Sequence, residues 1–271
     1  MLDFFSTKII LFAIIGAVLT GYTCSLMGTF VVRMNLSSLG FAMSHAAFAG
    51  AALGLFLRKD PLIFALLFST FVSLALGPLA DKAKLKTDVV IGVIFSLSMA
   101  IGLLFLNLSP DTAMSSTAMS ILWGSVLGMT TADIIYLLII TVIAILFVVM
   151  FFKEINAILF DRKLARSSGI NDKPFYYLIL ILTSLTVAFS LKLVGGLLVF
   201  ALMINPTSSV YQFSYDMKKI IIFSPIVGVV SCLLGMLMSF SFDLPTGSSI
   251  AIVCSAIFGI SVLISPKRRK G

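Results

Sequence analysis

His45 is the only histidine in the chain and the only titratable side chain that lies well inside a long apolar run. A neutral imidazole can bind a soft or borderline divalent metal, accept a proton, or hydrogen-bond a neighbouring helix. A closed structural zinc site requires four nitrogen or sulfur ligands, which one histidine per chain does not supply. His45 therefore predicts either a helix–helix hydrogen bond or a transient metal contact, completed by a second chain, by backbone carbonyls or by water.

Other groups that could do chemistry are sparse. All eleven acidic residues fall in loops or at the ends of apolar runs, and Cys24, Cys232 and Cys254 stand alone, without the paired spacing of a zinc or disulfide site. No G-x-x-x-x-G-K-[ST], H-E-x-x-H or G-x-S-x-G pattern occurs. The sequence thus predicts a chain that is not an enzyme and binds no cofactor, so that uphill transport would need a separate motor.

The composition of this chain is typical of a protein embedded in a lipid bilayer. Of the 271 residues, 60% are hydrophobic and 11% are charged, and the mean hydropathy is +1.16. Soluble domains carry about 25% charged residues. This excludes a soluble enzyme, a nucleic-acid-binding domain and a disordered protein, so no nucleic acid is expected as a partner. We predict an all-α polytopic membrane protein with eight or nine transmembrane helices in a single domain, residues 1–271.

Nine apolar runs are candidate membrane spans because each approaches the roughly 20 residues that cross a bilayer. They cover residues 9–31, 37–57, 61–80, 89–107, 133–152, 174–191, 193–212, 220–240 and 246–264. The 193–212 run is uncertain because Gly195-Gly196 and Pro206 interrupt it. The semi-polar 112–130 segment predicts an external loop with a short helix. The 42–54 segment is rich in Gly and Ala, so we expect its helix to be buried within the bundle.

The distribution of Lys and Arg predicts the orientation. If the 108–132 loop faces outward, fifteen of the nineteen basic residues lie in inward segments, as the positive-inside rule requires. This places the C-terminus in the cytoplasm and, with nine spans, the N-terminus outside. If one candidate is not a true span, the N-terminus changes side.

Four stretches of sequence carry a family resemblance. They read GTFVVRMNLSSLGFAMSHAAFAGAALG (Gly28–Gly54), FDRKLARSSGI (Phe160–Ile170), VGGLLVFALMINPTSS (Val194–Ser209) and DLPTGSSIAIV (Asp243–Val253). In this order and spacing they resemble the permease subunits of bacterial and archaeal ABC importers for zinc, manganese and iron(II).

The resemblance implies a permease bundle of the metal/vitamin B12 importer type in a prokaryotic plasma membrane. It also implies a divalent metal as cargo, alternating access as mechanism, and three partners. These are a cytoplasmic ATP-binding subunit, an extracellular metal-binding protein, and a second copy of the chain or a paralogous permease. The alternatives are a permease of the same family for another cargo, such as a metal chelate, and a passive channel or secondary carrier.

The residues carried over from the family include two departures. The family commonly places an Asp one helical turn before the His, where this chain has Phe41, so the acidic partner of His45 is missing. Asn205 precedes Pro206 where an apolar residue is usual. It is either a polar residue of the pathway or a cap of the broken helix, and the cap is the favoured interpretation.

Two inward loops are predicted to couple the bundle to the ATPase. In the first, Asp161 begins a short segment in which Ala165 and Gly169, four residues apart, would let a helix lie in a groove of the partner, with Ile170 as an apolar anchor. The second loop offers amphipathic side chains of the kind enriched at protein interfaces, and these are Tyr211, Gln212 and Tyr215.

Overall fold

The computed structural model describes residues 2–85, 87–108, 124, 129–196 and 199–266, and within these residues the regular structure is entirely helical. The all-α fold predicted from composition is therefore confirmed. The helices are α1 (Leu2–Arg33), α2 (Leu39–Phe56), α3 (Pro61–Ala83), α4 (Thr87–Leu108), α6 (Thr131–Met150), α7 (Phe152–Phe160), α8 (Arg162–Ser167), α9 (Asp172–Val194), α10 (Val199–Tyr211), α11 (Met217–Phe242) and α12 (Thr246–Ile264).

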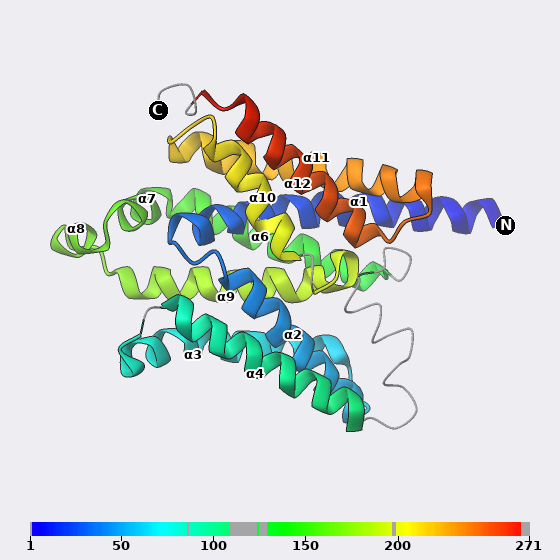
Figure 1. Cartoon of the computed structure of the whole chain (residues 1–271), viewed down its shortest axis with the longest axis horizontal. Coiled ribbons are helices and arrows are strands. Elements are labelled where there is room, and N and C mark those ends of the chain that lie inside the picture. The colour runs from blue at the N-terminus through cyan, green and yellow to red at the C-terminus, as the bar shows by residue number, and fades with distance from the viewer. Residues whose placement is uncertain (1, 86, 109–123, 125–128, 197–198, 267–271) are drawn as a thin grey trace.

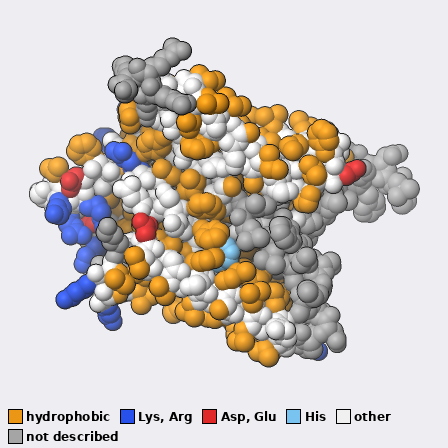
Figure 2. All heavy atoms as spheres, viewed as in Figure 1, with side chains coloured by type: hydrophobic (Ala, Val, Ile, Leu, Met, Phe, Trp, Pro, Cys, Tyr) orange, Lys and Arg blue, Asp and Glu red, His pale blue; other side chains and the backbone are white. Residues whose placement is uncertain are grey.

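Eight of these helices are long and apolar enough to cross a membrane, namely α1, α2, α3, α4, α6, α9, α11 and α12. Together with the shorter helix α10 they form three groups (Figure 1): α2–α4 along one side, α10–α12 along the other, and α1, α6 and α9 between them. The short helices α7 and α8 project beyond one end of the bundle. Lys and Arg side chains gather at this end (Figure 2), and we call it the basic end.

One of the nine predicted spans, 193–212, is corrected by the structure. Helix α9 continues to Val194 and ends at Gly195, which has a φ of 85°. Helix α10 has only 13 residues. At 1.5 Å per residue it covers about 20 Å of a hydrocarbon layer about 30 Å thick. Helix α10 nevertheless returns towards the basic end, so α1 begins and α12 ends at opposite ends of the bundle (Figure 1). The predicted 112–130 loop and helix lie outside the described residues, apart from Gly124 and residues 129–130.

Proline inside α10 is accommodated by α1. Because Pro206 has no N–H, the carbonyl of Leu202 loses its helical donor. The hydroxyl of Ser25 donates to this carbonyl at 3.1 Å, and Thr207 donates in return to the Ser25 carbonyl at 3.1 Å. These reciprocal hydrogen bonds hold the half-length helix against a full-length one.

Helix α2 is the most extensively buried of the eight candidate spans. Fourteen of the eighteen residues of α2 are buried, as its small side chains predicted. A Cβ atom added to Gly50 would lie 2.2 Å from the carbonyl oxygen of Phe64, so glycine is what lets α3 approach. Cys24, Cys232 and Cys254 are all buried and free of disulfides, as their isolated positions in apolar runs indicated.

Candidate functional site

His45 lies on α2 with only 3% of its surface exposed. Its Nδ1 atom is 2.8 Å from the carbonyl oxygen of Phe41, one turn earlier. A carbonyl oxygen only accepts hydrogen bonds, so Nδ1 carries the proton and Nε2 keeps its lone pair. No described residue gives Nε2 a hydrogen bond, and the His45 side chain is visible on the surface shown in Figure 2. The imidazole is therefore preset to bind a cation or a proton through Nε2.

Aromatic rings from α2 and α4 pack on this imidazole, and a third ring from α10 packs on the first of them. The centroids of Phe41 on α2 and Phe95 on α4 each lie 4.6 Å from that of His45, and both rings meet it edge to face. Phe41 also stacks on Phe95 at 4.5 Å and contacts Phe200 of α10 at 5.6 Å. Within the described residues no group of three or more His, Cys, Asp or Glu side chains could hold a metal ion. The His45 cluster (Phe41, His45, Phe95 and Phe200) therefore offers one nitrogen ligand and three apolar aromatic rings.

The sequence had suggested that Asn205 caps a broken helix, but in the structure it does not. It lies within α10, and its side-chain amide donates a hydrogen bond of 2.9 Å to the Ser255 hydroxyl on α12. The residue thus ties α10 to α12, and it remains partly exposed, as the alternative pathway role requires.

The first predicted coupling segment forms a compact corner at the basic end. Asp161 caps α8 by accepting hydrogen bonds from the backbone N–H groups of Lys163 and Leu164, at 2.7 and 3.0 Å. These bonds hold the pKa of Asp161 below its usual value. At the other end of α8, Ile170 N–H bonds the Ala165 carbonyl and Gly169 N–H bonds the Arg166 carbonyl, both at 3.0 Å. This is a Schellman ending, in which Gly169 supplies the positive φ of 84°.

The small residues of this corner therefore have a different task from the one predicted. Ala165 is 2% exposed and covered by its own chain, and a Cβ atom on Gly169 would meet nothing within 4 Å. The apolar side chains that this corner presents outward are Phe160, 77% exposed, and Leu164, 58% exposed. Sequence reasoning missed both, although an apolar side chain in a loop rich in Lys and Arg was a usable signal.

The second predicted coupling segment lies at the same basic end, between α10 and α11. Tyr211 is partly buried, and its hydroxyl donates a hydrogen bond of 3.8 Å to the sulfur of Met217, the first residue of α11. The Gln212 carbonyl accepts a hydrogen bond of 3.0 Å from Ser265, just beyond α12. Tyr215, in contrast, is 71% exposed. Tyr211 and Gln212 therefore join helices within the bundle, while Tyr215 exposes most of its side chain at the surface.

Comparison with known proteins identifies this arrangement of helices. Residues 6–265 match the ABC 3 transport family. The chain belongs to this family. As an ABC 3 permease it is a multi-pass membrane protein, which agrees with the resemblance drawn from the four sequence stretches.

Curated relatives cover nearly the whole of this permease. The manganese transport system membrane protein MntC of Listeria monocytogenes is 32% identical over 94% of the chain and 90% of its own length. The manganese import system permease protein ScaB of Streptococcus gordonii is 30% identical, with 95% and 91% covered. The chelated iron transport system membrane protein YfeD of Yersinia pestis is 32% identical, with 93% and 84% covered.

Solved structures share the fold of this permease. PsaBC from Streptococcus pneumoniae, in complex with Fab, superposes with a TM-score of 0.86 at 27% identity, covering 99% of this chain and 98% of that one. A putative metal-chelate type ABC transporter in an inward-facing conformation gives a TM-score of 0.78 at 18% identity, with 93% and 85% covered. The second likeness concerns the fold alone.

Proposed function

We propose that this ABC 3 permease conducts a divalent transition-metal cation, manganese, zinc or iron(II), through the bacterial or archaeal plasma membrane. The observation that carries the proposal is that His45 Nδ1 holds the proton, which leaves the Nε2 lone pair without a hydrogen bond from any residue that the structure describes, beside aromatic rings of α2, α4 and α10. The names of the similar proteins from Listeria and Streptococcus, which state manganese transport, support this class of cargo.

The orientation follows from the basic end, which we place in the cytoplasm because Lys and Arg are retained on that side of a membrane. The cytoplasmic ATP-binding subunit then docks on Phe160, Leu164 and Tyr215, and the external metal-binding protein docks at the opposite end. A second copy of the chain, or a paralogous permease, closes the pathway. Because ATP-driven movement of the basic end would be transmitted through α1 and α10, alternating access is the mechanism we favour over a passive channel.

The chemistry of the His45 cluster favours weak binding of a bare ion. One imidazole supplies a single ligand, and Phe41 supplies none, so the remaining ligands come from water or from the second permease copy. A metal chelate, which brings its own ligands, is the second candidate cargo. It is favoured by the apolar wall of Phe41, Phe95 and Phe200, and the name of the Yersinia relative states chelated iron.

The experiment is uptake by proteoliposomes that contain the permease assembled with its ATPase subunit. We expect ATP-dependent manganese uptake that His45→Ala lowers at least tenfold, with assembly unchanged on size-exclusion chromatography. Ser255→Ala, which removes only the partner of Asn205, is the matched control. Equal uptake by an ATPase-inactive complex would instead identify a passive channel, and normal uptake by His45→Ala would reduce His45 to a packing residue.

A further inference from the structure

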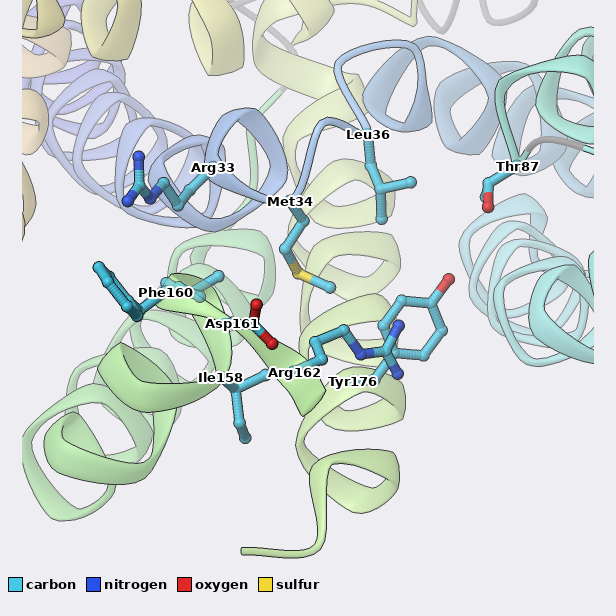
Figure 3. Close-up of a pocket in the computed structure, with 10 residues that line it drawn as sticks. Arg33, Met34, Leu36, Thr87, Ile158, Phe160, Asp161, Arg162 and Tyr176 are labelled. Carbon is cyan, nitrogen blue, oxygen red and sulfur yellow. The ribbon is translucent and has the colours of Figure 1, made fainter. Parts of the chain in front are cut away.

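A cavity of about 240 Å³ opens at the basic end, between the α1–α2 turn, the junction of α7 and α8, and the first turns of α9 (Figure 3). A second cavity of about 240 Å³ lies beside it and shares three lining residues, Thr87, Arg162 and Tyr176. The second cavity is also lined by Gly77, Arg166, Lys173 and Tyr177. None of these residues has a part in the proposed metal pathway.

The charged side chains of this second cavity are arranged for an anion. The carboxylate of Asp172, whose side chain is 1% exposed, holds both guanidinium groups: Arg162 Nε at 2.8 Å and Arg166 Nη2 at 3.0 Å, with a further bond from Arg166 Nε. Arg162 is also fixed over the Tyr176 ring at 4.7 Å. With Lys173, three positive charges stand against one negative charge. The surplus is two, and each guanidinium retains N–H groups beyond those that Asp172 binds.

A tetrahedral oxyanion fits these donors better than a carboxylate does. Guanidinium groups bind phosphate through paired N–H donors, and their planes are already oriented here by Asp172 and Tyr176. Thr87 and Tyr177, whose side chains carry neutral hydroxyl donors, also line the cavity. Gly77 makes room for Tyr177, since a Cβ atom there would lie 2.8 Å from the tyrosine hydroxyl.

The surroundings of the cavity favour a lipid as the source of such a phosphate group. The cavity lies where α3 ends and α9 begins, and Tyr176 and Tyr177 have the amphipathic character of membrane-interface residues. Further from the basic end, Leu74 on α3 and Leu178 on α9 are 42% and 41% exposed, and so offer apolar surface for acyl chains. Basic pockets between transmembrane helices are a recurrent mode of binding anionic headgroups.

We propose that this cavity binds the phosphate group of an anionic phospholipid from the leaflet that meets the basic end. The lipid joins α8 to α3 and α9, and thereby anchors the corner that carries Phe160 and Leu164. The site is independent of the cargo, because its residues lie at the end of the bundle and the His45 cluster lies within it.

The test is native mass spectrometry of the purified permease–ATPase complex in detergent, with phosphatidylglycerol and phosphatidylcholine of identical acyl chains. We expect preferential retention of phosphatidylglycerol. Lys173→Gln should lower that retention at least about tenfold, as the loss of one charge-assisted hydrogen bond implies. Because Arg166→Gln also disturbs the Asp172 cluster, Lys173→Gln and Tyr177→Phe serve as variants that leave the cluster intact. Lys153→Gln, an exposed cation at the same end outside the cavity, is the control.

Three results would overturn the proposal. The first is equal retention of the two lipids, and the second is a loss in Lys153→Gln as large as in Lys173→Gln. The third is unchanged lipid retention with weakened ATPase binding in Lys173→Gln, which would identify the cavity as a protein-docking site. Millimolar inorganic phosphate added as a competitor separates the sources of the anion. A site saturated by phosphate in the absence of any lipid preference would be a free-anion site, contrary to the lipid assignment.

Discussion

Gly28 of α1 lies directly against the Met203 carbonyl of α10, and a Cβ atom at Gly28 would come within 1.9 Å of that oxygen. Real Cβ contacts do not become so short, and the obstacle is backbone, so no side-chain rotation relieves it. The two helices are therefore in backbone contact beside the His45 cluster, where α10 contributes Phe200. This contact makes the position of α10 sensitive to a single methyl group.

We predict that Gly28→Ala destabilises the permease by about 1–3 kcal/mol or more, the usual cost of overpacking a core. The measurement is the thermal midpoint followed by size-exclusion chromatography in detergent. Gly259→Ala on α12 is the matched control, because nothing lies within 4 Å of a Cβ atom there. It should leave stability unchanged or raise it by about 0.5–1 kcal/mol. Equal midpoints for the two variants would show that α10 can move away from α1 at little cost.

Ser25 and Pro206 yield a second prediction, in the form of a double-mutant cycle. Ser25→Ala leaves the Leu202 carbonyl without a donor, and we expect a loss of about 1–3 kcal/mol, as for an unsatisfied buried polar group. In the Pro206→Ala background the loss should be smaller, because alanine restores the N–H that proline removes. The same cost in both backgrounds would mean that Ser25 does not compensate for Pro206.

The third prediction concerns Phe41, which packs edge to face on His45. Phe41→Asp places a carboxylate one turn from the imidazole and converts a single ligand into a mixed oxygen and nitrogen pair. We expect manganese or zinc to bind the purified complex at least tenfold more tightly, with slower release and reduced uptake. Phe41→Asn introduces a side chain of the same size as Asp but without its charge, so it separates the effect of metal ligation from that of loosened packing. The prediction is wrong if the Asp and Asn variants bind metal equally.

The fourth prediction concerns coupling at the basic end. Leu164→Ser and Tyr215→Ala remove exposed side chains, and we expect each to lower transport per ATP hydrolysed several-fold while the bundle keeps its thermal midpoint. Leu57→Ala, also exposed but near the opposite end, is the control. Gly169→Leu is less informative, because its positive φ would strain the end of α8. Normal coupling in both test variants would place the ATPase contact elsewhere.

The long helices could be predicted because a helix that crosses a lipid bilayer needs a continuous apolar run, and such runs are evident in the sequence. The sequence overestimated α10, because the same apolar composition serves a half-length helix whose polar backbone groups are satisfied by neighbouring helices. Ser25 and Thr207 provide those hydrogen bonds from positions 182 residues apart, and local patterns carry no information on such a pair.

Only the part of the candidate site that lies on a single helix could be predicted from the sequence. The four-residue spacing of Phe41 and His45 placed them together, but Phe95 and Phe200 arrive from helices whose position depends on the tertiary fold. The same holds for Asp172, which looked like an ordinary loop carboxylate. In the structure it is almost fully buried between Arg162 and Arg166.

The burial of Cys24, Cys232 and Cys254 has a practical consequence. Their exposed fractions are 0%, 0% and 1%, so a hydrophilic maleimide should leave the folded, unmodified chain unlabelled. Single cysteines introduced at Leu57 and Lys153 would then report their surroundings against a silent background. Intact cells treated from outside should label the first and spare the second, which would map the sidedness of this permease without removing any native cysteine.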